Sequence, residues 1–265
     1  MLVPVPDGWP SRQRPAGPEP LLFPAPPAQW RAPESILGPL QGVAPAHSAP
    51  ASRFPGAFNG PVYAMQRLHA GPRLFLTCRP AWYFDSLETC ERLEREGRYR
   101  HERPPERRAM DGSGRTAAIG ISTVMAWRAA GGWRALAAPL AARSMPQRAG
   151  LLHVVPSGML APPYSIAANV RRELQEELGL SFDPRRLWLA GAALNPLNQR
   201  PEICTVYVCP CRPGGRLNAE FAPRLVEIPL TPRFRLAQLG SFFPAGAAAL
   251  VLAARLLFHP CRGEL

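Results

Sequence analysis

The amino-acid sequence predicts an α+β fold in which β-strands are sandwiched between helices. Two observations lead to this prediction. Short runs of β-branched and aliphatic residues follow one another from residue 116 onward, and two helical segments accompany them, at residues 165–179 and 244–258. A chain of 265 residues is long enough for one good-sized domain of this kind with additional segments.

The first strands are expected as a hairpin. Residues 116–128 are apolar and β-branched, and residues 133–140 return after the Gly131-Gly132 turn. Residues 73–78 form a shorter apolar run before this hairpin and also predict a strand. Later strands are expected at residues 151–156, 187–193, 203–209 and 225–229.

The helix expected at residues 165–179, after the strand at 151–156, is bounded at both ends. Ser165 is a good N-cap residue, and Gly179 suits the left-handed position that ends a helix. Apolar residues recur every four positions and predict the face that docks on the core: Ile166, Val170, Leu174 and Leu178.

The segment at residues 244–258 is rich in alanine and leucine and carries Arg255. It predicts a helix of about 15 residues, shorter than the roughly 20 apolar residues that a membrane span needs. We therefore expect a buried helix that closes the sheet, and no membrane segment.

Three glutamates share one face of the bounded helix. Glu173, Glu176 and Glu177 are spaced i, i+3 and i+4, so like charges would repel by tenths of a kcal/mol per pair unless a cation lies among them. Mg²⁺ prefers oxygen ligands, usually one or two carboxylates together with substrate phosphates. A solvated acidic face, with Arg172 and Glu176 paired at i,i+4, would give the same pattern without a metal.

This segment resembles the Nudix hydrolase family, whose box reads G-x5-E-x7-R-E-U-x-E-E-x-G-U, with U aliphatic. The residues in register lie within 158–180, and one fixed position departs, because Tyr164 stands where the first box glutamate belongs. Residues 151–158 also resemble the strand and turn that lead into the box, with Ser157 in place of a glycine. The matching positions are Gly158, Arg172, Glu173, Leu174, Glu176, Glu177, Gly179 and Leu180.

The resemblance implies a Nudix-type mixed sheet and a loop–helix–loop that holds Mg²⁺ or Mn²⁺ against a pyrophosphate. It implies metal binding by Glu173, Glu176 and Glu177, orientation of these carboxylates by Arg172, and a loop set by Gly158 at the substrate. In many family members the missing glutamate is the partner of this arginine. The phenol of Tyr164 can at most accept a hydrogen bond from Arg172.

Two functions follow as hypotheses. The first is metal-dependent hydrolysis of a pyrophosphate linkage in a nucleoside diphosphate derivative, with a further carboxylate from outside the box, for which Glu202 and Glu220 are candidates. The second is a catalytically degenerate domain that senses a nucleotide ligand without cleaving it. Replacing Tyr164 by glutamate is expected, on the first hypothesis, to strengthen the activity or leave it intact.

The region before residue 116 is interpreted as two segments. Residues 1–60 hold many of the 34 prolines and are expected to form a largely disordered leader, in which Leu21, Leu22 and Phe23 could anchor locally. Residues 61–115 are expected to be an accessory extension, with an exposed helix at 86–96 and a charged loop at 98–108. The Nudix-like domain is expected at residues 116–260.

The charge is strongly positive, at +12, and all 31 basic side chains are arginines. Such a surface attracts polyanions, so nucleic acid is a possible partner, but no helix-turn-helix pattern supports it. The sequence leaves the oligomeric state open.

Six cysteines are present, and Cys204, Cys209 and Cys211 form the one cluster. Their spacing fits no common zinc pattern, so buried free thiols are expected. No apolar secretory segment is visible, and cytoplasm is the expected compartment. His153, in the strand before the box turn, is expected to be a core or edge residue.

Overall fold

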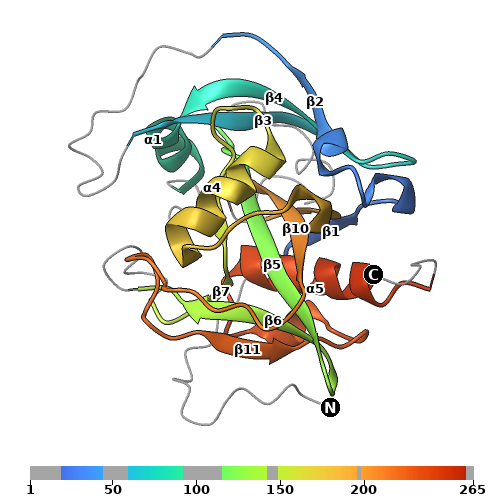
Figure 1. Ribbon diagram of the computed structural model, residues 1–265. Coiled ribbons are helices and arrows are strands. Elements are labelled where there is room, and N and C mark those ends of the chain that lie inside the picture. Colours follow the sequence, from blue (N-terminus) through green and yellow to red (C-terminus); the bar gives the residue numbers. More distant parts are fainter. Residues whose placement is uncertain (1–18, 44–58, 92–114, 142–148, 196–197, 261–265) are drawn as a thin grey trace.

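The computed structural model describes residues 19–43, 59–91, 115–141, 149–195 and 198–260 of the chain (Figure 1). The described residues form two β-sheets with helices packed against the larger one. The larger sheet has the strand order β1-β9-β10-β5-β6-β11, with β7 added to β6 and β8 to β5. Because β10 and β5 run parallel while the other neighbours are antiparallel, the sheet is mixed, and the predicted α+β class is confirmed.

The central strands agree with the sequence prediction. β5 (Gly120–Ala129) and β6 (Gly132–Pro139) form the expected hairpin, and β10 (Pro201–Cys209) lies between β5 and β9 (Leu187–Leu194). Every residue of β9 is buried, which explains its near-continuous apolar sequence. The remaining strands of this sheet are β1 (Leu21–Pro24), β7 (Leu152–Val154), β8 (Ser157–Met159) and β11 (Val226–Pro229).

Two long helices cover this sheet. α4 (Ile166–Leu178) packs against β5 and β8, and α5 (Pro244–Leu257) packs against β5, β7, β9 and β10 (Figure 1). Nearly all of α5 is buried, as its alanine and leucine content predicts, and Arg255 is its exposed exception. No helix in the described ranges has the length and apolar character needed to cross a bilayer.

The smaller sheet consists of β2 (Leu37–Leu40), β4 (Phe75–Trp82) and β3 (Pro61–His69), in that order. It is joined to the core through the backbone. Tyr63 N donates to Leu160 O at 2.8 Å, and Ile119 N donates to Tyr63 O at 2.9 Å. The predicted strand at 73–78 is therefore part of a sheet that borders the entry to α4.

Residues 19–43 belong to the fold, so the expected disorder is wrong for them, whereas the local anchoring expected of Leu21, Leu22 and Phe23 is confirmed because these residues pack against the core. β1 pairs with β9, and two short 3-10 helices follow it, η1 (Pro27–Gln29) and η2 (Pro33–Ile36). Trp30 and Ile36 are buried in the main core, so apolar anchors offset the high proline content here. Residues 1–18 and 44–58 lie outside the described ranges.

The exposed helix expected at residues 86–96 is also corrected. The chain forms a short α1 (Tyr83–Ser86) and a π-helical turn (Leu87–Glu91), and Phe84 and Cys90 are buried. Residues 92–114, including the expected loop at 98–108, fall outside the described part. Two further 3-10 turns complete the structure, η7 (Pro184–Arg186) and η8 (Leu236–Leu239).

Candidate functional site

Helix α4 begins and ends as its sequence predicts. Ser165 Oγ accepts a hydrogen bond from Ala168 N at 3.2 Å, which is N-capping. Gly179 adopts the left-handed conformation with φ 67°, and its N–H bonds to Gln175 O at 3.0 Å. These two caps set where the glutamate-bearing helix begins and ends.

A second cap comes from far away in the sequence. Both carboxylate oxygens of Glu34 on η2 accept from the first turn of α4, from Ile166 N at 2.9 Å and Ala167 N at 2.7 Å, and Ser165 Oγ donates to it at 2.8 Å. A negative charge on the N-terminal N–H groups stabilises a helix. The segment before β2 therefore helps to hold the glutamate-bearing helix, a role that its local sequence did not indicate.

Glu177 is the most deeply placed of the three box glutamates, with 1 % of its surface exposed. Its Oε2 accepts from Ser157 N at 3.2 Å, whereas its Oε1 is buried without a hydrogen-bond partner among the described residues. Burial, first, and then the nearby charges of Glu173 and Glu220 raise the pKa of Glu177 well above its usual range. A buried carboxylate oxygen without a donor is costly unless a proton or a cation satisfies it.

Glu173 lies beside Glu177 and is held by the arginine that precedes it. Arg172 Nη2 donates to Glu173 Oε1 at 2.7 Å and to Asn169 Oδ1 at 2.9 Å. Burial raises the pKa of Glu173, and the bond from Arg172 opposes that rise. Arg172 thus orients one of the carboxylates, and its second partner is the neutral side chain of Asn169.

Asn169 was not recognised in the sequence. Its side chain is buried and bonds to the backbone of the loop before the helix, to Ala161 O at 2.9 Å and Ser165 O at 2.8 Å. It therefore couples the loop to Arg172. The only available signal was a small polar residue on the apolar side of α4, three positions before the arginine.

Tyr164 does not face Arg172, which corrects the expectation that its phenol could accept a bond from that arginine. Its hydroxyl donates to Gly38 O on β2, and its ring makes an edge contact with Tyr63, with centroids 5.0 Å apart. Burial, together with Cys78 beside it, raises the pKa of Tyr164. Tyr164 therefore joins the loop before α4 to the smaller sheet rather than to the carboxylates.

Gly158 leaves room for Glu173. A Cβ atom at this position would lie 2.1 Å from Glu173 Oε1, which is closer than two such atoms can approach. The preceding residue, Ser157, donates its backbone N–H to Glu177, so this contact does not depend on the side chain at position 157. Gly158 and the turn before it therefore shape the carboxylate site.

Replacing Gly158 by alanine is expected to displace Glu173 from Arg172 and to weaken Mn²⁺ binding at least tenfold, about 1.4 kcal/mol. Isothermal titration with Mn²⁺ measures this. Gly131→Ala is the matched control, because a Cβ there meets nothing nearer than Arg134 Nη2 at 3.8 Å. Equal Mn²⁺ affinity in the two variants would contradict the assigned role of Gly158.

The two candidate carboxylates from outside the box have different positions. Glu220 is close enough to contribute to the raised pKa values of Glu173 and Glu177, and burial, then Glu176, raises its own pKa. Its backbone is tied to the end of β6, since Ala141 N donates to Glu220 O at 2.9 Å. Glu176 and Glu220 are both exposed residues at the rim of this group.

Glu202 lies away from this group, on β10. Its carboxylate accepts a hydrogen bond from Ser122 Oγ and packs against Gly120, where a Cβ would lie 2.0 Å from Oε2. Burial raises the pKa of Glu202 to about 7, although the bond from Ser122 and the charge of Arg200 oppose the rise. Of the two candidates, Glu220 is the one beside the helix glutamates.

Glu202 predicts a pH dependence of stability. Its pKa rises from 4.5 when unfolded to about 7 when folded. Its contribution to the free energy of unfolding is therefore greatest below pH 4.5 and is lost as the pH rises toward 7. A shift of this size corresponds to about 3 kcal/mol. Urea unfolding of the parent and Glu202→Gln at pH 5 and pH 8 should show the variant losing less stability. Identical losses would mean that Glu202 ionises freely.

The carboxylate group fits a divalent cation in its chemistry. It brings together Glu173 and Glu177 with the exposed Glu176 and Glu220 at the rim, and it contains a buried oxygen without a donor among the described residues. Hard oxygen donors of this kind suit Mg²⁺ and Mn²⁺. Within the described ranges, no three His, Cys, Asp or Glu side chains are grouped tightly enough to enclose an ion. The carboxylates thus border a site without closing around it.

The histidine and the cysteines considered in the sequence lie on β7, on β10 and just after β10. His153 is a buried residue of β7 in edge contact with Phe243, as expected for a core histidine. Cys204 and Cys209 are buried free thiols, and burial raises the pKa of Cys209 to about 12. Cys211 is also free but exposed, so the expectation of buried thiols is wrong at that position.

No protein-family model and no curated protein matches this sequence. Solved structures resemble part of it. A MutT/nudix family protein from Enterococcus faecalis is 12 % identical with a TM-score of 0.37, covering 50 % of this chain and 48 %, about half, of that chain. The NUDIX domain of Shewanella oneidensis NrtR, crystallised with ADP ribose, is 12 % identical with a TM-score of 0.41, covering 61 % of this chain and 96 % of that chain. The MutT protein from Methanosarcina mazei is 19 % identical with a TM-score of 0.39, covering 52 % of this chain and 93 % of that chain. At these TM-scores we draw nothing about activity or substrate from the likeness.

Proposed function

We propose that this protein is a metal-dependent hydrolase of pyrophosphate linkages in nucleotide derivatives. The observation that carries the proposal is the buried Oε1 of Glu177, which has no donor in the described structure and lies among Glu173, Glu176 and Glu220. Burying Glu177 beside other carboxylates destabilises the metal-free fold. A divalent cation among them would relieve that cost, and the resemblance to the box supports Glu173, Glu176 and Glu177 as its ligands.

In this proposal Glu173, Glu176 and Glu177 hold Mg²⁺ or Mn²⁺, and Glu220 is the additional carboxylate. The metal, when bound, would neutralise phosphate charge and lower the pKa of a water molecule. Arg172 keeps Glu173 oriented through the 2.7 Å ion pair, and the Ser157 N–H keeps Glu177 oriented. Gly158 leaves the space that Glu173 occupies. The box turn and α4 together thus supply the binding side chains and their supports.

A second function is favoured by one observation, the position of Tyr164. Where the family box has a glutamate, this side chain turns toward Gly38, and Arg172 bonds to the neutral Asn169 instead. A domain altered in this way could retain a nucleotide ligand without cleaving it and act as a sensor. The two functions differ in turnover and agree in ligand class.

Turnover separates them. The protein is incubated with Mg²⁺ and a panel of nucleoside diphosphate sugars, dinucleotides and nucleoside triphosphates, and products are separated by anion-exchange chromatography. At least one compound should be cleaved, with a loss of 100-fold or more in Glu177→Gln and none in Glu227→Gln, an exposed glutamate on β11. No cleavage, combined with tight binding of one compound, would establish the sensor. Cleavage that survives EDTA or Glu177→Gln would overturn the assignment.

A further inference from the structure

A pocket of about 350 Å³ opens on the large sheet away from the carboxylates. Ser122 on β5 pairs with Ser157 beside the box turn, whereas Arg128 lies six residues further along the same strand. At 3.3 Å per residue the two ends are about 20 Å apart. The Arg–Trp groove, as we name the charged and aromatic part of this pocket, consists of Arg31, Arg128, Arg185, Arg186, Trp133 and Trp188.

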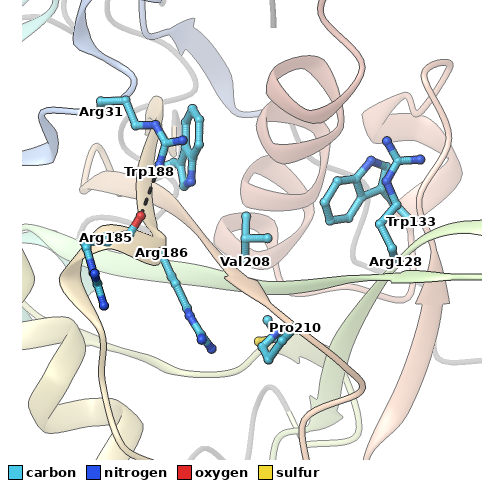
Figure 2. Close-up of a pocket in the computed structure, with 9 residues that line it drawn as sticks. Arg31, Arg128, Trp133, Arg185, Arg186, Trp188, Val208 and Pro210 are labelled. Atoms are coloured by element: carbon cyan, nitrogen blue, oxygen red, sulfur yellow. Dashed lines mark hydrogen bonds between the residues drawn. The ribbon is translucent and has the colours of Figure 1, made fainter. Parts of the chain in front are cut away.

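The arginines enter the groove from two sides. Figure 2 shows Arg31, Arg185 and Arg186 at one side, Arg128 with Trp133 at the other, and Val208 and Pro210 between them. The first side comes from η7 and the segment after η1, and the second from the β5–β6 hairpin. Segments far apart in the sequence thus place guanidinium groups around one opening.

Two of the guanidinium groups are stacked on buried indoles. Arg31 Cζ lies 3.3 Å from the ring centroid of Trp188, and Arg128 Cζ lies 4.6 Å from that of Trp133. Arg31 Nη1 also donates to Arg185 O at 3.1 Å (Figure 2). Stacking fixes the plane of a guanidinium and leaves its N–H edge and outer face for a ligand. The groove is therefore organised before any ligand arrives.

Positive charge is in excess in this groove. Among the described residues, its arginines form ion pairs with Asp183, from Arg185 Nε at 3.2 Å and from Arg186 Nε at 3.5 Å. One carboxylate does not balance four guanidinium groups. Cys209 in the wall has its pKa raised to about 12 by burial, so its thiol stays neutral and unreactive. The groove is built for binding an anion rather than for chemistry.

We propose that the Arg–Trp groove binds the phosphodiester backbone of single-stranded nucleic acid. The planar donor fork of arginine fits phosphate oxygens, and bases stack on guanidinium planes as well as on aromatic rings. The pocket is lined by Arg, Trp, Val, Cys and Pro, so guanidinium groups are its charged donors, and phosphate oxygens are the acceptors that they fit. The net charge of +12 supplies long-range attraction.

Fluorescence anisotropy with a labelled oligo-dT strand tests this in EDTA, which keeps the carboxylate site out of the measurement. Arg128→Gln with Arg185→Gln removes one arginine from each side of the groove. Arg233→Gln with Arg255→Gln removes two exposed arginines elsewhere and is the matched control. The groove pair should lose tenfold or more in affinity and the control pair less than twofold. The logarithm of the association constant falls linearly with the logarithm of the salt concentration, and the magnitude of this slope should be smaller by about 1.4 in the groove pair.

Equal losses in the two pairs would overturn the proposal, because net charge alone would then explain the binding. The absence of binding by the parent at low salt would overturn it as well. AMP would also be added to the complex, with salt of equal ionic strength as the control. If AMP displaces the strand and the salt does not, the groove binds a free nucleotide instead. Arg128→Lys with Arg185→Lys keeps the charge and carries the test if the glutamine pair does not fold; it should lose affinity by a smaller factor.

Discussion

Replacing Glu177 by glutamine is expected to raise the melting temperature of the metal-free protein and to abolish its response to Mn²⁺ or Mg²⁺. The carboxylate is 1 % exposed, and its Oε1 has no donor among the described residues. A glutamine keeps an acceptor for Ser157 N and offers N–H donors toward Glu173 and Glu220, so a gain of about 1–3 kcal/mol is expected. The lost ligand removes the stabilisation that binding of the metal supplies.

Thermal unfolding with EDTA and with Mn²⁺ measures both effects in one experiment. Glu176→Gln combined with Glu177→Gln should abolish the metal response as well. Glu227→Gln is the control, because Glu227 pairs with Arg212 at an exposed position on β11 and should leave the metal response unchanged. A Glu177→Gln protein that responds to metal as the parent does would show that these carboxylates do not bind it.

Replacing Tyr164 by glutamate is expected to destabilise the protein by about 2–4 kcal/mol, rather than to leave it intact or improve it. The residue is half-buried, its hydroxyl donates to Gly38 O, and it packs against Tyr63. A carboxylate here would face a carbonyl oxygen that has lost its donor, with Glu34 as a nearby like charge. A glutamate at position 164 is therefore not expected to pair with Arg172, because the Tyr164 side chain bonds to β2.

Tyr164→Phe separates the two contributions, since it removes the hydroxyl and keeps the ring. A loss of about 1 kcal/mol is expected from the hydrogen bond. Urea unfolding of both variants, together with the substrate panel, gives the answer. A Tyr164→Glu protein as stable as the parent and more active would mean that this side chain can turn to Arg172, contrary to the geometry described above.

The elements with a clear sequence period were predicted well. The Gly131-Gly132 turn gave the β5–β6 hairpin, the Ser165 and Gly179 signals gave the ends of α4, and the alanine-rich segment gave the buried α5. These are local signals, so one sequence is enough to interpret them. The spacing predicted that Glu173, Glu176 and Glu177 share one face of α4, but it did not predict that Glu177 is buried.

Contacts between distant segments could not be predicted. Glu34 caps α4 from 132 positions away, and the hydroxyl of Tyr164 reaches Gly38 across 126 positions. The many prolines before residue 60 suggested disorder, and although Leu21, Leu22 and Phe23 were recognised as local anchors, the burial of Trp30 and Ile36 in the core was not predicted. The Arg–Trp groove also combines three segments, and nothing in the local sequence of any one of them indicates an anion site.

A crystal structure grown with Mn²⁺, with an anomalous map, tests the central claim most directly. We predict a Mn²⁺ peak roughly 2 Å from a carboxylate oxygen of Glu177 and bordered by Glu173 and Glu220. The peak should be absent from Glu177→Gln crystals. A map with no peak at these carboxylates in Mn²⁺-saturated parent crystals would contradict the metal site, and with it the proposed hydrolase.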